Sequence, residues 1–206
     1  MKLNKLGICG LLSLLSYAAM VFFSPLAYPG YDWLTMAVSD LGAVGAPSAD
    51  LADQLSALFG PCGIVNIMVV CVGIAGVKSK TTRVGVYLFA AMEWVVEVGY
   101  DLFPWIAGRD LDNFQNIMHL VVTVAVVVLS IVSLIVIGIG TRKSSVKSLG
   151  IWAWVCLGAM MIGAMGTGLG PKSIFGLFER FSCFAAVIFN AVLGIYLFMG
   201  KFDENR

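Results

Sequence analysis

Residues 117–140 read IMHLVVTVAVVVLSIVSLIVIGIG, a stretch that contains no Lys, Arg, Asp or Glu. A helix needs roughly 20 apolar residues to cross the hydrocarbon core of a bilayer, and this stretch is long enough. Five further stretches meet the same condition. We therefore predict an all-α polytopic membrane protein, a six-transmembrane-helix bundle that forms one domain over residues 1–206. The predicted spans are about residues 6–27, 52–77, 84–105, 117–140, 149–169 and 174–200.

The composition excludes the main alternatives to a membrane protein. Of the 206 residues, 60% are hydrophobic and only 12% are charged, whereas a soluble domain is roughly half apolar and about a quarter charged. So few charges cannot cover a water-facing surface, and so many apolar residues exclude a disordered chain. The net charge is only +1, whereas nucleic-acid-binding proteins carry an excess of basic residues. We therefore expect membrane lipids, and not nucleic acid, as partners.

The distribution of the 13 Lys and Arg residues predicts the orientation, because cytoplasmic connections carry an excess of both. Three of them lie on or near one side: Arg109, Lys172 and Arg180. The other ten lie at the termini or in the alternate connections: Lys2, Lys5, Lys78, Lys80, Arg83, Arg142, Lys143, Lys147, Lys201 and Arg206. We predict a plasma-membrane protein with both termini in the cytoplasm, which agrees with an even number of spans. The first span is longer than a signal peptide, so we expect it to be retained.

Cysteine and histidine usage does not point to a metal site. The five cysteines all fall inside predicted spans without CxxC spacing, and we interpret them as small packing residues. The single histidine, His119, cannot supply the several ligands that zinc sites normally take. No glycine-rich phosphate loop is present. We therefore expect no metal and no cofactor.

The first outer connection, residues 28–51, reads YPGYDWLTMAVSDLGAVGAPSADL. Asp32, Thr35 and Ser39 recur at i, i+3 and i+7, and apolar residues fill the complementary arc. This spacing predicts a short amphipathic helix, ended by Gly42, that lies in the headgroup layer.

The third span carries acids at helical spacing. Glu93, Glu97 and Asp101 recur at i, i+4 and i+8, which places the three carboxyls on one stripe of one helix. A charged carboxylate at the bilayer centre costs at least ~2.5 kcal/mol on insertion scales. The acids are therefore protonated through desolvation, paired with cations, or in contact with a wet cavity.

We predict that the scarce ionisable residues converge in an outward-opening pocket. Glu179 and Arg180 are adjacent in span six and point about 100° apart, so they do not pair well with each other. The structural alternative is a buried salt-bridge network that sets helix register, with Glu93 as a protonated core acid. The predicted pocket contains Glu97, Asp101, His119, Glu179 and Arg180, roofed by Ser39 and Asp40, with Asn66 and Asn190 as further polar groups within the spans.

Short motifs in order along nearly the whole chain resemble a prokaryotic six-span membrane family, catalogued as domain of unknown function nine-nine-eight. They are Pro29, Ser39–Asp40–Leu41–Gly42, Pro47, Asp101-x-Phe103–Pro104, His119 and Gly176-x-x-Glu179–Arg180. A fainter likeness, through the Ser-Asp-x-Gly run, points to the Frag/DRAM lipid-associated group. This resemblance implies a lipid-facing role and supports one constellation of Ser39, Asp40, Asp101, His119, Glu179 and Arg180. It assigns no reaction.

Three functions stay open. The first is a protein that binds, and as an enzyme hydrolyses or modifies, a lipid or amphiphile. The catalytic acid–base residues would be Glu97, Asp101 and His119, Arg180 would hold an anionic headgroup, and Ser39, Asp40, Glu93 and Glu179 would contact the ligand. The second is a small proton-coupled transporter that uses Glu93, Glu97 and Asp101. The third is a structural or regulatory protein with a buried ion-pair network.

Span five is rich in glycine. Ala159, Gly163 and Thr167 follow the small-xxx-small spacing that lets helices approach closely. We expect this face to pack within the chain, with a homo-oligomer interface as the alternative.

Overall fold

The structure is a computed structural model that describes residues 3–108 and 112–203. Of the cations used above to predict orientation, Lys2, Arg109 and Arg206 lie outside the described residues. Within the described ranges the chain forms α-helices, short 3₁₀ segments and one isolated bridge between Val44 and Ile106. The α-helices are α1 (Ile8–Phe23), α2 (Ala49–Ser56), α3 (Phe59–Gly73), α4 (Lys80–Leu102), α5 (Phe114–Gly140), α6 (Lys147–Leu169) and α7 (Phe175–Phe198). The 3₁₀ segments are η1 (Leu3–Gly7), η2 (Ser24–Ala27), η3 (Ile74–Gly76), η4 (Thr141–Lys143) and η5 (Lys172–Ile174).

Five helical segments of the described chain are long and apolar enough to cross a membrane. The all-α class is therefore confirmed, and the chain is a membrane protein by the length and composition of its helices. The five segments are Leu3–Ala27, Ala49–Gly76, Phe114–Gly140, Lys147–Leu169 and Lys172–Phe198.

The third predicted span corresponds to α4. Its 23 residues extend for about 34 Å, which matches a hydrocarbon core of roughly 30 Å. Its carboxyls, on Glu93, Glu97 and Asp101, make it more polar than the other five segments. That α4 crosses the bilayer as a sixth span therefore stays a prediction, as do the plasma membrane and the cytoplasmic termini.

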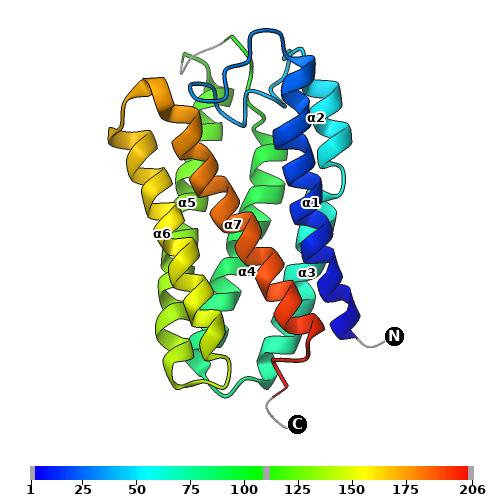
Figure 1. Ribbon diagram of the computed structural model, residues 1–206, viewed down its shortest axis with the longest axis vertical. Coiled ribbons are helices and arrows are strands. Elements are labelled where there is room, and N and C mark those ends of the chain that lie inside the picture. The colour runs from blue at the N-terminus through cyan, green and yellow to red at the C-terminus, as the bar shows by residue number, and fades with distance from the viewer. Residues whose placement is uncertain (1–2, 109–111, 204–206) are drawn as a thin grey trace.

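The long helices run side by side along the length of the molecule (Figure 1). α4 packs along α5, α6 along α7, and α1 lies against both α3 and α7. η1 and the C-terminal end of α7 lie at the same end of the bundle, at the bottom of Figure 1. The connection between α1 and α2 covers the opposite end, which we call the outer end.

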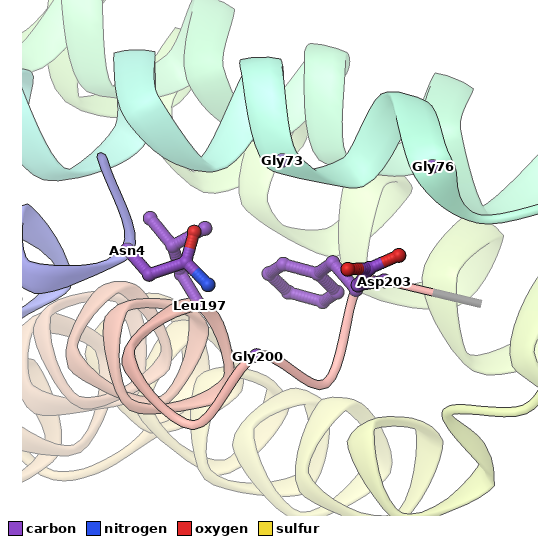
Figure 2. A pocket seen from close by; sticks show the side chains of 7 residues that line it. Asn4, Gly73, Gly76, Leu197, Gly200 and Asp203 are labelled. Atoms are coloured by element: carbon purple, nitrogen blue, oxygen red, sulfur yellow. The ribbon is translucent and has the colours of Figure 1, made fainter. Parts of the chain in front are cut away.

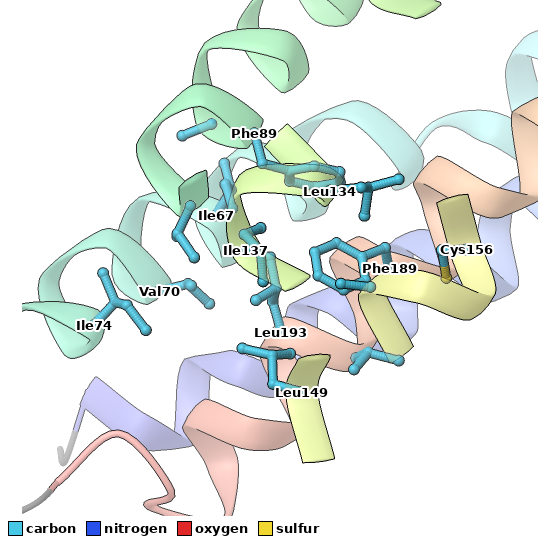
Figure 3. Close-up of a cluster of buried hydrophobic side chains, with 14 of the residues drawn as sticks. Ile67, Val70, Ile74, Phe89, Leu134, Ile137, Leu149, Cys156, Phe189 and Leu193 are labelled. Carbon is cyan, nitrogen blue, oxygen red and sulfur yellow. The ribbon is translucent and has the colours of Figure 1, made fainter. Parts of the chain in front are cut away.

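The residues of the main apolar core place it in the half of the bundle that is farther from the outer end. Figure 3 shows these side chains from close by. Phe89 of α4 and Phe189 of α7 meet edge to face at 5.1 Å between ring centroids, and Ile67 and Leu193 are fully buried beside them. Cys156 belongs to this core as a free thiol, which agrees with the interpretation of the cysteines as packing residues. In a bilayer such a core is stabilised by close van der Waals packing rather than by removal of apolar surface from water.

The predicted amphipathic helix in the first outer connection is wrong. Residues 28–48, which we call the outer loop, form turns and bends without a helix. Asp32 accepts a hydrogen bond from Leu34 N–H at 3.0 Å, and this bond holds the pKa of the Asp32 carboxyl below its ordinary value. Asp40 likewise accepts from Ala37 N–H at 2.9 Å. Such local bonds from side chain to backbone compete with helical hydrogen bonding, so the amphipathic spacing does not produce a helix.

The second predicted span is divided in two. α2 ends at Ser56, and α3 begins at Phe59 after a short turn. Pro61 lies in the first turn of α3, where its missing N–H costs no helical hydrogen bond. The Ser16 hydroxyl of α1 accepts from Leu58 N–H at 3.3 Å, so the turn is held against the first span.

The close approach predicted for Gly163 is confirmed, and it lies within the chain. A Cβ atom placed on Gly163 would be 2.5 Å from Ser182 N and 2.6 Å from Phe178 O, both backbone atoms of α7. Only glycine leaves room for that contact between α6 and α7. Gly158, five residues earlier in α6, faces open space, with no neighbouring atom within 4 Å of such a Cβ.

We predict that Gly163→Ala destabilises the bundle by about 1–3 kcal/mol, because α6 and α7 must move apart. The matched control is Gly158→Ala, which leaves stability unchanged or raises it by up to about 1 kcal/mol through helix propensity. Thermal unfolding in detergent measures both variants. Equal melting temperatures for the two would contradict the assigned α6–α7 contact.

Candidate functional site

The outer loop is held to the bundle by the buried side chain of Arg180, which is 4% exposed. Nη1 of Arg180 donates to the carbonyl oxygens of Trp33 at 2.9 Å, Met36 at 3.2 Å and Gly176 at 2.7 Å. Nη2 donates to the Tyr31 hydroxyl at 2.6 Å. The Trp33 ring also lies over the guanidinium, with its centroid 4.0 Å from Cζ. The guanidinium is therefore surrounded by neutral dipoles and aromatic rings.

Glu179, the neighbour of Arg180, binds a different part of the same loop. Its carboxylate accepts a hydrogen bond from Val38 N–H. Among the described residues no ion pair joins Glu179 to Arg180, in agreement with their predicted divergence on the helix. Two adjacent side chains of α7 thus satisfy loop carbonyl and amide groups that a helix would have paired internally.

Tyr31 completes this attachment. Its hydroxyl accepts from Arg180 and donates to the Ala37 carbonyl oxygen at 2.6 Å. Burial raises the pKa of Tyr31 to about 12, although the nearby Arg180 charge acts in the opposite direction. The phenol therefore stays protonated and keeps its donor bond over the physiological pH range.

Gly176 allows the loop to approach α7. A Cβ atom on Gly176 would lie 2.1 Å from the Met36 carbonyl oxygen and 2.9 Å from that of Trp33. The Gly176-x-x-Glu179–Arg180 motif therefore has a physical basis, in which glycine provides space and the two charged residues provide hydrogen bonds. Leu177 N–H adds a backbone bond to the Leu34 carbonyl oxygen at 3.3 Å.

His119 lies in separate surroundings, near the end of α4. Its Nδ1 is 2.8 Å from the Phe103 carbonyl oxygen, and since a carbonyl only accepts, Nδ1 is the donor and Nε2 is left as an acceptor in the neutral ring. The imidazole packs on Tyr100 and Trp105, with centroid distances of 4.8 and 5.6 Å.

The three acids of α4 also differ in their surroundings. Asp101 is exposed, and Glu97 is partly buried against Gly60 of α3, where a Cβ would collide with its carboxyl. Glu93 is buried, and the Asn190 side chain hydrogen-bonds to it. Asn66 in turn donates to the Asn190 side chain at 2.8 Å. Glu93 therefore belongs to a buried polar cluster deeper in the bundle.

The predicted site residues thus fall into separate groups. Asp40, Glu179 and Arg180 all bind backbone groups of the outer loop, in which Ser39 also lies. His119 and Glu97 contact other residues, and Glu93 is buried beside Asn190. Their proposed chemical roles stay predictions. Within the described residues, no three His, Cys, Asp or Glu side chains gather in a way that could hold a metal ion.

A groove that the sequence did not predict reaches Arg180 from the side. We call it the α6–α7 groove; its volume is about 390 Å³. Apart from Arg180, its lining side chains are apolar or aromatic, and Trp33 of the outer loop lies at the same end as Arg180. The lining residues are Trp33, Trp152, Val155, Cys156, Ala159, Leu177, Arg180, Phe181, Phe184, Ala185 and Ile188.

A second hollow, of about 200 Å³, lies at the opposite end of the bundle (Figure 2). Glycines at positions 73, 76 and 200 make room for it, and Phe202 and Asp203 follow α7 along its edge. None of the predicted site residues lines this hollow.

Comparison with known proteins places the chain in a family. The model of a family described as protein of unknown function (DUF998) matches residues 11–196. The chain therefore belongs to this family, and the resemblance found in the short motifs is confirmed. The fainter likeness to the Frag/DRAM group stays a prediction. No curated protein and no solved structure matches the chain.

We predict that Gly176→Ala detaches the outer loop, because the added methyl group would overlap the loop carbonyls of Trp33 and Met36 and push the loop away from α7. Limited proteolysis between residues 28 and 48 should become faster by at least about tenfold, which corresponds to roughly 1.4 kcal/mol in the opening equilibrium. Gly168→Ala is the control, since no atom lies within 4 Å of a Cβ at that position. Equal cleavage rates in the two variants would show that Gly176 is not needed for loop attachment.

A second prediction concerns the alkaline range. The pKa of Tyr31 is about 12 in the fold and about 10 in an unfolded chain, so the folded state keeps a proton that the unfolded state loses. The stability contributed by this difference is complete below pH 10 and is lost as the pH rises toward 12. Tyr31→Phe should therefore have a lower melting temperature than the wild type at pH 8. The difference between the two melting temperatures should become smaller between pH 10 and 12.

The exposed Tyr87 provides the control for this measurement. Tyr87→Phe removes one phenol without touching the outer loop, and its melting temperature should follow the wild type at every pH. A gap for Tyr31→Phe that stays constant up to pH 12 would contradict the buried, protonated state of Tyr31.

Proposed function

We propose that this member of the family is a membrane protein that binds a lipid or another amphiphile in the α6–α7 groove. The observation that carries the proposal is an apolar groove that ends at a buried guanidinium. Ligand sites typically combine an apolar lining with a few polar groups that orient the ligand. A groove with one charged end matches a molecule that has an apolar chain and a polar head.

The surroundings of the groove support an apolar occupant from the bilayer. Val155 and Phe181, which line it, are 57% and 42% exposed, so the groove opens on a surface that faces the hydrocarbon if α6 and α7 span the membrane. Apolar side chains do not retain water, whereas lipid chains are in contact with this surface at high concentration. The plasma membrane and the cytoplasmic position of both termini are part of the same proposal.

We propose that the groove binds the lipid, and we treat chemical conversion of that lipid separately. Nε2 of His119 is available as an acceptor, which keeps His119 as a candidate general base. Neither His119 nor the acids of α4 line the groove, so an enzymatic form of the proposal receives no support from the groove itself.

The network around Glu93 favours a structural role for that carboxyl. Glu93, Asn190 and Asn66 are all buried. The Asn190 side chain hydrogen-bonds to Glu93, and Asn66 donates to the Asn190 side chain. A buried polar cluster of this kind between helices sets their register, although Asn66 Oδ1 has no hydrogen-bond partner among the described residues. The proton-coupled transporter interpretation, which uses Glu93 together with Glu97 and Asp101, stays a prediction without an observation that favours it.

The test is to fill the groove. Ala159→Leu places a larger side chain in the lining, and we expect the amount of co-purified lipid per protein to fall by about tenfold, the effect of roughly 1.4 kcal/mol in binding. The control is Ala91→Leu, an identical change at an exposed position of α4 outside the lining. Lipid is quantified by extraction and mass spectrometry of protein purified in mild detergent.

Melting temperatures of both variants show whether the fold is retained. Equal lipid content in a folded Ala159→Leu variant and in the control would overturn the proposal that the α6–α7 groove is the binding site.

A further inference from the structure

We infer that the occupant of the α6–α7 groove is an anionic phospholipid of the outer leaflet, with one acyl chain along the groove and its phosphate at the guanidinium of Arg180. This inference rests on the proposed function and names the class of ligand. It depends on the charge at one end of the groove and on the length of the groove.

The surroundings of Arg180 favour an anionic headgroup. All hydrogen-bond partners that Arg180 has among the described residues are neutral, namely three carbonyl oxygens and the Tyr31 hydroxyl. Its Nε is buried and has no hydrogen-bond partner. Glu179 and Asp40, the nearby acids, accept from backbone N–H groups of the loop. Glu179 is close enough to interact electrostatically with Arg180, so what the site offers an anion is the unused Nε donor of a guanidinium, and phosphate oxygens match guanidinium geometry.

The length of the groove matches one acyl chain. On α7 the lining begins at Leu177, next to the outer loop, and ends at Ile188. A rise of about 1.5 Å per residue makes this distance about 16 Å, which is half of the roughly 30 Å hydrocarbon core. The groove is therefore about one leaflet deep, which suits a single lipid from the outer side rather than a path across the membrane.

Trp33 lies where the headgroup and the chain would meet. Its ring covers the guanidinium at 4.0 Å from Cζ and stacks on Phe22 of α1 at 5.6 Å between centroids. Because Nε of Arg180 is shielded, a phosphate oxygen reaches it only when the Trp33 ring moves aside. We therefore expect binding of the anionic lipid to change the environment of Trp33. Tryptophan in general prefers the membrane–water interface, which is the depth proposed for this ring.

The experiment is a competition on the wild-type protein. Delipidated protein is exposed to an equimolar mixture of phosphatidylglycerol and phosphatidylcholine with identical chains, and bound lipid is counted by native mass spectrometry. We expect phosphatidylglycerol to be retained at least about tenfold over phosphatidylcholine. Equal retention would overturn the anionic class while leaving lipid binding intact, whereas retention of neither lipid would overturn the proposed function as well.

Two variants locate the preference. Ala159→Leu should lose both lipids, and Arg180→Lys should lose the preference while it keeps a positive charge, because lysine cannot form the paired hydrogen bonds of a guanidinium. Persistence of the phosphatidylglycerol preference in a folded Ala159→Leu variant would place the anionic site elsewhere and overturn the inference. If Arg180→Lys does not fold, the wild-type competition and Ala159→Leu still decide the outcome.

A fluorescence measurement provides an independent readout. Phosphatidylglycerol with brominated acyl chains should quench the wild-type protein more strongly than a variant that carries both Trp33→Phe and Trp152→Phe, because these two tryptophans line the groove. Equal quenching in the two proteins would contradict the assigned position of the lipid.

Discussion

The outer half of this protein depends on one buried cation. Hydrogen bonds to charged groups contribute about 1.5–3 kcal/mol each, and Arg180 makes four of them to the outer loop and to its own helix. A guanidinium buried in this way is tolerated because carbonyl dipoles and the Trp33 and Tyr31 rings replace water around it. The same neutral partners leave Arg180 Nε without a hydrogen-bond partner, and this unused donor is what makes the outer end of the α6–α7 groove suited to an anionic oxygen.

The two halves of the bundle are held together by different interactions. The inner half contains the apolar core around Phe89 and Phe189, where close packing determines the arrangement of the helices. The outer half contains the loop, Arg180, Glu179 and His119, where hydrogen bonds act together with a smaller apolar cluster of Tyr17, Val21, Val38 and Val187. The groove connects the two halves, since Trp33 closes one end and Cys156 of the core lines the other part.

Sequence patterns predicted the helices well because their cause is local. The charge-free run at 117–140 is contained in α5, and the other predicted spans each match a helix or a pair of helices within a few residues. The same patterns gave a wrong prediction for the outer loop, and the reason is physical. Its amphipathic spacing resembled a helix, but its backbone groups are bound by Arg180 and Glu179, residues more than 140 positions away in the chain. A backbone carbonyl has no signature in a sequence, so its partner cannot be inferred from residue types.

The sequence by itself determined that the chain is a helical membrane protein of this family, which residues are scarce ionisable groups, and that Gly163 lies at a close helix contact. Only the tertiary structure decided that Arg180 binds carbonyls rather than carboxylates, that His119 and Glu97 contact other residues, and that a groove joins Trp33 to α6 and α7. The reason is that helix formation follows from hydrophobic periodicity over neighbouring residues, whereas a site is formed by side chains and backbone groups that only the packing of distant helices brings together.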